Sequence, residues 1–247
     1  WAHGEADRST DRKSYIETLN RLIEQFEDAM SETGIPIEWM FIQPAGTNHQ
    51  GSGNCWDNRL ALLDVSRERQ NAHTCITGYW TPLEDGVHYS AKGRVLLGEH
   101  VGRKIVALET GQRAEIARLK KIRLDETRVT LTFDTDAPII IADDIDLAHE
   151  PACGFWSVDK NRSTIISVEE VSDTMIALNL DQPPDPKTLT IGYAHRNWGR
   201  KDALLNGSEI LPIGRGALRT IFSEPSAYFP DETQYDWVAS FMVKASK

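Results

Sequence analysis

Cysteine is scarce in this sequence. The 247 residues include three cysteines, Cys55, Cys75 and Cys153, with no C-x-x-C spacing. An odd number without that spacing implies neither a zinc site nor a disulfide framework, and small buried thiols are the favoured interpretation. A disulfide between Cys55 and Cys75 stays open, and no metal or cofactor is expected.

Positive charge and long apolar runs are scarce as well. The chain has 27 Lys and Arg against 37 Asp and Glu, a formal charge of −10. Such a balance repels phosphate backbones and anionic lipid surfaces, so we expect neither nucleic acid nor membrane as a partner. No run of about 18 apolar residues occurs, which excludes a typical membrane-spanning helix from these residues.

The first residues, Trp1-Ala2-His3-Gly4-Glu5, lack a Met and lack the basic and apolar regions of a secretion signal. We therefore expect the sequence to begin in the middle of a gene product.

The first part of the chain alternates helical and strand patterns. Residues 11–32 place Tyr15, Leu19 and Ile23 among others at helical spacing, and Gly34 follows as a stop. Further patterns predict strands and helices at residues 35–43 (strand), 56–69 (helix), 73–76 (strand) and 90–108 (helix). This order predicts an α/β region with crossover connections on a parallel sheet.

Beyond Thr110 the pattern changes to short runs rich in β-branched residues, separated by Asp, Asn, Pro and Gly. These runs lie at residues 128–133, 138–141, 164–168, 175–180 and 188–193. They are typical of an antiparallel β-sandwich. We predict one domain over residues 1–111 and a second over residues 112–247.

Asp85 and His88 lie at the entry of the third predicted helix, in Asp85-Gly86-Val87-His88. An Asp three residues before a His can accept the Nδ1 proton and leave Nε2 free to act as a base. The alternative for Asp85 is a simple helix cap.

Two blocks together carry a family resemblance: Trp1-Ala2-His3-Gly4-Glu5-Ala6-Asp7, and Asp85 to His88 followed by a glycine-containing helix. In this order they resemble the SGNH hydrolases, in the branch of sialate O-acetylesterases, carbohydrate acetylesterases and esterase domains of phage tail proteins. That branch has W-x-Q-G-E-x-D and D-G-x-H. The resemblance implies the C-terminal part of a three-layer, flavodoxin-like parallel sheet, followed by the β-sandwich.

The resemblance also implies roles for individual residues. His88 is the general base and Asp85 orients it. His3, Gly4 and Glu5 belong to the oxyanion and substrate-binding group, where His3 replaces the usual Gln and donates from a neutral imidazole. Asp7 is expected to cap the following turn. For His3, a packed position at the end of a strand remains an alternative.

The nucleophilic serine of this family lies in a block that is absent here. Ser9 and Ser52 are poor candidates, because Ser52 lies in a Gly-Ser-Gly loop without a strand-to-helix elbow. We therefore expect the serine upstream or on another chain, and the fragment alone to be inactive.

The resemblance implies hydrolysis of a carbohydrate O-acyl ester, most simply an O-acetyl group on a polysaccharide or glycan. It implies an extracellular or virion-associated protein, either a homotrimer or associated with an N-terminal segment that carries the nucleophile. The alternative is a non-catalytic phage tail module that binds a receptor or glycan on an esterase scaffold.

Other patterns have simpler interpretations. Asp143, Asp144, Asp146 and Glu150 lack the spacing of a calcium loop and are expected to form a solvated turn. The tryptophans at positions 156, 198 and 237 could stack on sugars, but core or interface positions are favoured.

Overall fold

The computed structural model describes residues 1–4, 7, 10–45, 57–85, 88–145, 149–194, 204–206, 209–211 and 214–245. The chain begins with α1 (Arg12–Met30), for which Asp11 is the N-cap, accepting the backbone N–H of Ser14 at 3.0 Å. Tyr15, Leu19 and Ile23 form its buried stripe. The 3₁₀ turn η1 (Ser31–Thr33) follows and ends at Gly34, which has a φ of +67°. The helix predicted over residues 11–32 is confirmed.

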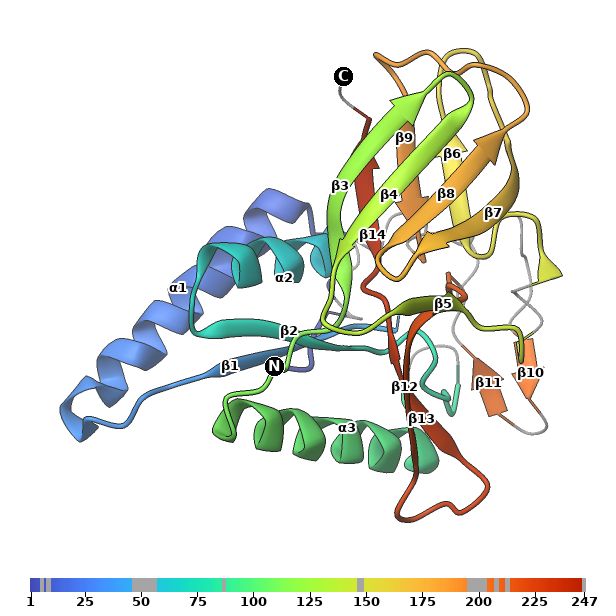
Figure 1. The fold of residues 1–247 in the computed structure, drawn as a ribbon. Coiled ribbons are helices and arrows are strands. Elements are labelled where there is room, and N and C mark those ends of the chain that lie inside the picture. Colours follow the sequence, from blue (N-terminus) through green and yellow to red (C-terminus); the bar gives the residue numbers. More distant parts are fainter. Residues whose placement is uncertain are drawn as a thin grey trace.

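Two parallel strands form the centre of the first region. β1 (Trp39–Gln43) and β2 (Ala72–Thr77) pair in parallel and are connected through α2 (Asp57–Glu68), while α3 (Ala91–Glu109) follows β2. Figure 1 shows α1 and α2 on one side of this pair and α3 on the other. Ala2 adds a parallel bridge to Ile42, which places the N-terminal residues alongside β1.

The prediction of a three-layer, flavodoxin-like parallel sheet is wrong. Of the fourteen described strands, only β1 and β2 form a parallel sheet, and the other sheets are antiparallel. The physical reason lies in the connections, because a parallel neighbour requires a crossover. Among the described elements α2 supplies one between β1 and β2, whereas the chain after α3 leaves this sheet and continues in strands joined by turns.

Two antiparallel sheets form the upper part of Figure 1. One has the order β3 (Arg118–Asp125), β4 (Arg128–Asp134), β8 (Met175–Leu180), β7 (Ile165–Ser172). The other has the order β14 (Phe241–Lys244), β9 (Thr190–Tyr193), β6 (Phe155–Val158). Their inner side chains, such as Leu131, Ile191 and Phe241, share one buried core.

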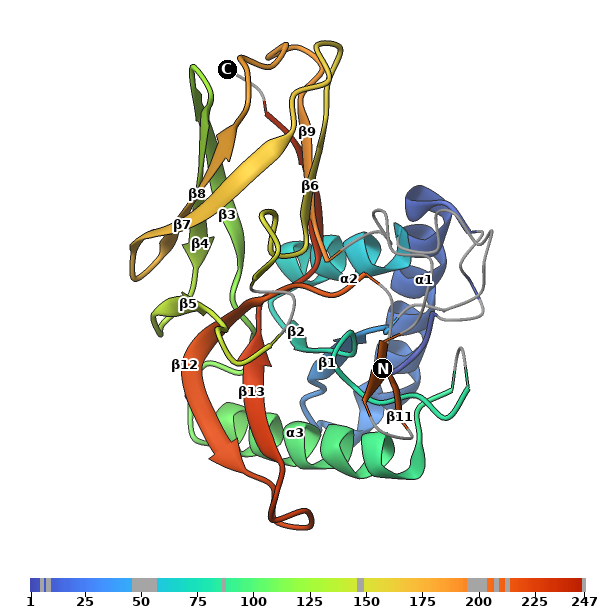
Figure 2. The same ribbon diagram turned by 90° about the vertical axis from the view of Figure 1, so that its right-hand side faces the viewer.

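A third antiparallel sheet extends beside α3, as Figure 2 shows. It has the order β13 (Thr233–Trp237), β12 (Leu218–Pro225), β5 (Ile139–Ile141). The short pair β10 (Leu204–Asn206) and β11 (Glu209–Leu211) is separate.

The segments before and after Gly111 are joined by buried contacts. Tyr79 is fully buried in the core of the antiparallel sheets, and its hydroxyl donates to the carbonyl of Val238 at 2.7 Å. Gln43 exchanges hydrogen bonds with the backbone of Ser240, at 2.9 and 3.2 Å. The parallel pair is therefore held against the end of the antiparallel region by polar contacts that span nearly the whole chain.

Of the three tryptophans considered as sugar-stacking candidates, Trp156 lies in the core and Trp237 packs against it. Trp156 is 3% exposed, and Trp237 stacks on Trp80 with ring centroids 4.9 Å apart. Trp198 lies outside the described residues. Cys75 and Cys153 are buried thiols, as expected, and burial raises the pKa of Cys75 to about 12 and that of Cys153 to about 11. Cys55 lies outside the described residues.

Candidate active site

The loop between β2 and α3 carries the proposed acid and base. It leaves the sheet at Gly78, whose N–H donates to the carbonyl of Gln43 at 2.8 Å. It then folds back on itself, since Leu83 bridges Tyr89 and the N–H of Glu84 donates to the carbonyl of His88 at 2.8 Å. Asp85 and His88 therefore lie together at the tip of a closed loop.

Asp85 contacts His88 with both carboxylate oxygens. One oxygen accepts the backbone N–H of His88 and the other lies on Nδ1, each at 2.8 Å. A carboxylate only accepts, so Nδ1 carries the proton and Nε2 is left with a lone pair. This is the tautomer that a general base requires. The side chains of His88 and Asp85 are 70% and 57% exposed, so a partner group can reach them.

The start of α3 fixes the other end of this loop. Ser90 is the N-cap and accepts the N–H of Gly93 at 3.0 Å, while its own N–H donates to the carbonyl of Pro82. Gly93 touches the loop closely, because a Cβ there would lie 2.4 Å from the Pro82 oxygen and 2.9 Å from a Thr81 methyl. Only glycine allows α3 to approach the loop so closely.

Replacing Gly93 with alanine is therefore expected to destabilise the fold by about 1 to 3 kcal/mol, since the backbone of Pro82 must move. Gly98 offers a matched control in the same helix, because a Cβ there meets nothing within 4 Å. G98A should stabilise the protein by about 0.5 to 1 kcal/mol. Urea unfolding of both variants measures the difference, and equal shifts of the same sign would contradict the close approach.

His3 and Gly4 lie beside the end of β1, next to the bridge between Ala2 and Ile42. The Gly4 carbonyl accepts from the side-chain amide of Asn58, and a Cβ on Gly4 would lie 2.7 Å from that nitrogen. Gly4 also has a φ of +139°, so glycine is required there for two reasons. Glu5, the third residue of the predicted oxyanion and substrate-binding group, lies outside the described residues.

The surroundings of His3 limit what it can donate. Its Nδ1 lies 3.2 Å from a carboxylate oxygen of Asp7 and 3.5 Å from the hydroxyl of Tyr15. The Tyr15 hydroxyl donates to the His3 carbonyl at 3.2 Å. Both neighbours favour a proton on Nδ1, which leaves Nε2 of a neutral ring as an acceptor. In this form a neutral His3 has one ring donor, Nδ1, which faces Asp7.

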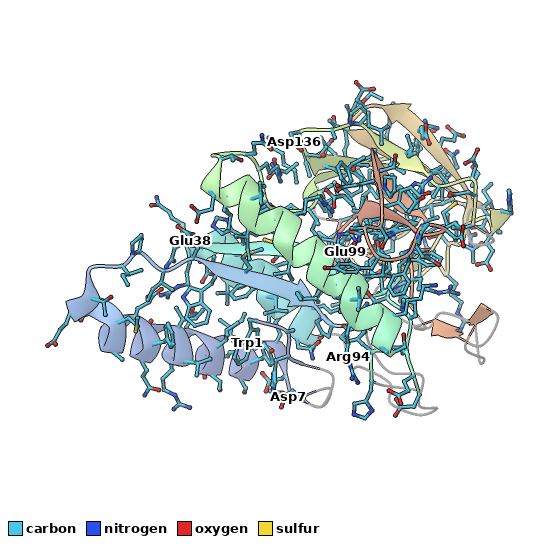
Figure 3. The ribbon with its side chains drawn as sticks, turned by 90° about the horizontal axis from the view of Figure 1, so that it is seen from below. Trp1, Asp7, Glu38, Arg94, Glu99 and Asp136 are labelled. Carbon is cyan, nitrogen blue, oxygen red and sulfur yellow. The ribbon has the colours of Figure 1, made fainter. Side chains whose placement is uncertain are left out.

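Asp7 contacts His3 rather than capping α1, whose cap is Asp11. Figure 3 shows Trp1 and Asp7 near the start of α1 and Arg94 near the start of α3, all toward the end of the sheet to which β1 points. The fold thus brings the N-terminal residues and the loop before α3 to the same edge. Tyr89, on that loop, accepts the N–H of Ala45 just after β1 at 3.1 Å.

The sequence analysis missed Arg59, the most buried charged residue at this edge. Its side chain is fully buried in the first turns of α2 and donates to the carbonyls of Pro44 and Ala194 at 2.6 and 2.5 Å, and to that of Ala45. It therefore holds the segment after β1 against the end of β9. The available signal was its position directly before the apolar run Leu60-Ala61-Leu62-Leu63, because a helix that buries this run also draws the adjacent residue toward the core.

Within the described ranges, no group of three or more His, Cys, Asp or Glu side chains could hold a metal ion. Likewise, none of the helices in the described part of the chain is long and apolar enough to cross a bilayer.

A partly buried histidine lies further along α3. Burial lowers the pKa of His100 to about 4, and the neighbouring Arg103 guanidinium adds to this effect. His100 Nδ1 lies 2.9 Å from Arg103, which also pairs with Asp236 at 2.6 Å. The folded protein therefore keeps His100 neutral at pH values where the unfolded chain, with an ordinary pKa of about 6.5, is protonated.

His100 is expected to make the free energy of unfolding fall by roughly 2 kcal/mol as the pH drops from 7 to 4.5. The unfolded state binds the additional proton in this window, so acid favours unfolding. Urea titrations of the wild type and H100Q at the two pH values measure this contribution. Glutamine keeps an acceptor for Arg103 but does not titrate, so its unfolding free energy should depend less on pH. Parallel pH dependences would show that His100 is not responsible.

No protein-family model matches the chain. A search of curated proteins also finds no match. Among solved structures, the chain is similar to a carbohydrate acetylesterase from Xanthomonas citri, with a TM-score of 0.58 and 13% identity over 93% of this chain. The chain thus shares its fold with a carbohydrate acetylesterase, and it spans 45% of that protein's length.

A bacterial S-layer protein, SbsC, also matches, in its N-terminal part. Its TM-score is 0.25 with 15% identity, over 56% of this chain and 28% of that chain. A similarity at this level carries no argument about fold or location.

Proposed function

We propose that this chain supplies the acid and base of an SGNH-type carbohydrate O-acyl esterase. The observation that carries the proposal is the pair of 2.8 Å contacts from Asp85 to the backbone and ring of His88, on a loop at the sheet edge. A carboxylate that holds Nδ1 and leaves Nε2 open is the arrangement by which serine hydrolases activate their nucleophile. The shared fold with a carbohydrate acetylesterase makes an ester of a carbohydrate the natural substrate class.

In the proposed reaction, the nucleophile is a serine hydroxyl from outside this chain. His88 Nε2 takes the hydroxyl proton as the oxygen bonds to the ester carbonyl carbon, and Asp85 stabilises the imidazolium. The imidazolium then gives the proton to the departing sugar hydroxyl, which breaks the ester bond and leaves an acyl-enzyme. Water, activated by the same Nε2, releases the acid and regenerates the serine.

The negative charge on the carbonyl oxygen needs hydrogen-bond donors. We assign His3, Gly4 and Glu5 to this region, as the resemblance implies. Nδ1 of His3 lies 3.2 Å from a carboxylate oxygen of Asp7, which orients the ring.

The exposure of the pair leaves room for the segment that carries the serine. With 70% of the His88 side chain open to solvent in this chain, a hydroxyl of that segment can approach Nε2. We also propose that the protein is extracellular, where acylated glycans occur. We further propose that it assembles with a segment that carries the serine.

The test is acetate release from p-nitrophenyl acetate and from an acetylated xylan. The 247-residue chain alone should be inactive, and a protein that joins it to the serine-bearing segment should release acetate. If the joined protein folds and binds the glycan but releases no acetate, the chain is a binding module on an esterase scaffold and the proposal is wrong.

A further inference from the structure

A cleft between α2 and the first antiparallel sheet concentrates positive charge. It has a volume of about 390 Å³ and is bounded by residues of α2, β3 and β14. Its basic lining residues are Arg12, Arg67, Arg118, Lys120 and Lys121. This local excess of positive charge contrasts with the formal net charge of the whole chain, which is −10.

The neighbouring carboxylates do not neutralise this cluster. Asp64 binds Arg12 through two contacts, at 2.5 and 2.6 Å, and lies 3.8 Å from Arg67. Asp134 contacts Arg118 at 3.2 Å but also Arg113 at 3.1 Å. These two carboxylates therefore contact three of the five cations that line the cleft, Arg12, Arg67 and Arg118, and also Arg113 beside it.

One guanidinium nitrogen has its donors unused. Nη1 of Arg118 is buried and has no hydrogen-bond partner among the described residues. A buried donor without an acceptor costs free energy, which an acceptor in the cleft would recover. Burial also lowers the pKa of Arg67, and the charges of Arg118 and Arg12 act in the same direction. The basic side chains here are close enough to repel one another.

A β-bulge contributes to the concentration of charge. Leu119 pairs with Phe133 and Lys121 with Thr132, so Lys120 is an extra residue in β3. Without a bulge, consecutive side chains alternate between the faces of a sheet, but Lys120 and Lys121 are both exposed, and both line the cleft. The bulge thus leaves two adjacent lysine side chains exposed beside the cleft.

We propose that this cleft binds an oxyanion, with the carboxylate of an acidic sugar as its source. Apolar side chains such as Leu60, Leu63 and Phe241 also line the cleft, and a less polar environment strengthens a charge-assisted hydrogen bond. Arginine presents paired donors that match the two oxygens of a carboxylate. The cleft shares no residue with the loop of Asp85 and His88, and the proposal does not rest on the esterase function.

Calorimetric titration of the chain with trigalacturonate tests this proposal, because that trisaccharide carries carboxylates. Maltotriose is the neutral probe of equal length, and inorganic sulfate is the free anion. We expect trigalacturonate to bind, its affinity to fall as salt is added, and maltotriose not to bind. The double variant R67Q/R118Q should lose at least about tenfold in affinity, and R118Q alone a smaller factor.

R128Q is the matched control, because Arg128 lies in the same sheet but pairs with Glu169 and Asn179 outside the cleft. It should bind like the wild type, and thermal unfolding verifies that each variant is folded. Binding of sulfate but not trigalacturonate, with the same loss in R118Q, supports the oxyanion cleft and identifies a free anion as its source. Equal binding of maltotriose, or wild-type affinity in R118Q and the double variant, would overturn the proposal.

Discussion

Replacing His88 with alanine is expected to lower kcat for acetate release by about a thousandfold or more in the protein that contains the serine segment. The variant removes the imidazole that Asp85 contacts through Nδ1, while the exposed side chain contributes little to folding. KM should change far less, because the imidazole acts on the proton and not on the sugar. Initial rates on p-nitrophenyl acetate measure both constants.

Two further variants show whether the effect comes from the pair itself. D85N keeps the shape of the side chain, but its amide can donate to Nδ1 and so stabilise the wrong tautomer of His88. Its kcat should fall at least about a hundredfold. E84Q changes the neighbouring carboxylate, which is exposed and lies 3.8 Å from Arg94. A pair this far apart on the surface contributes little, so E84Q should retain wild-type activity. Wild-type rates in H88A would rule out His88 as the general base.

Replacing Arg59 with methionine is expected to destabilise the fold by about 3 to 5 kcal/mol. Methionine fills much of the same space but removes the donors that Arg59 supplies to the carbonyls of Pro44 and Ala45, and leaves the carbonyl of Ala194 with only the Ser240 hydroxyl. These carbonyls lie in the interior, where water does not replace the lost hydrogen bonds. Urea unfolding monitored by tryptophan fluorescence measures the change in the free energy of unfolding.

The control for Arg59 is Arg94 in α3, which is 63% exposed and lies 3.8 Å from Glu84. R94M should change the free energy of unfolding by less than about 0.5 kcal/mol, as exposed substitutions usually do. If R59M unfolds at the same urea concentration as R94M, the buried guanidinium does not hold the segment after β1 in place.

The local features of the fold could be predicted because they depend on residues a few positions apart. Tyr15, Leu19 and Ile23 define a helix through their spacing, and Asp85 reaches His88 because an i, i+3 pair in a tight loop is close in any fold. Strands with strong β-branched patterns, such as β4 and β8, were predicted in the same way. β3 was missed, since Lys120 and Lys121 interrupt its alternation and belong to a bulge.

The assignment of strands to sheets was decided by the tertiary structure. The alternation of helices and strands in the first region predicted one large parallel sheet, but only β1 and β2 pair in this way. A strand pattern specifies which side chains face a core and leaves its partner open, because pairing depends on where the following connection leads.

The sequence by itself determined the helices and the pairing of Asp85 with His88, and it predicts the chemistry that we propose for this pair. Only the tertiary structure decided that Arg59 is buried under three carbonyls and that Arg12, Arg67 and Arg118 meet in one cleft. The reason is physical: neighbouring residues are placed by backbone dihedral angles, whereas residues about fifty positions apart meet only when buried apolar surfaces pack together.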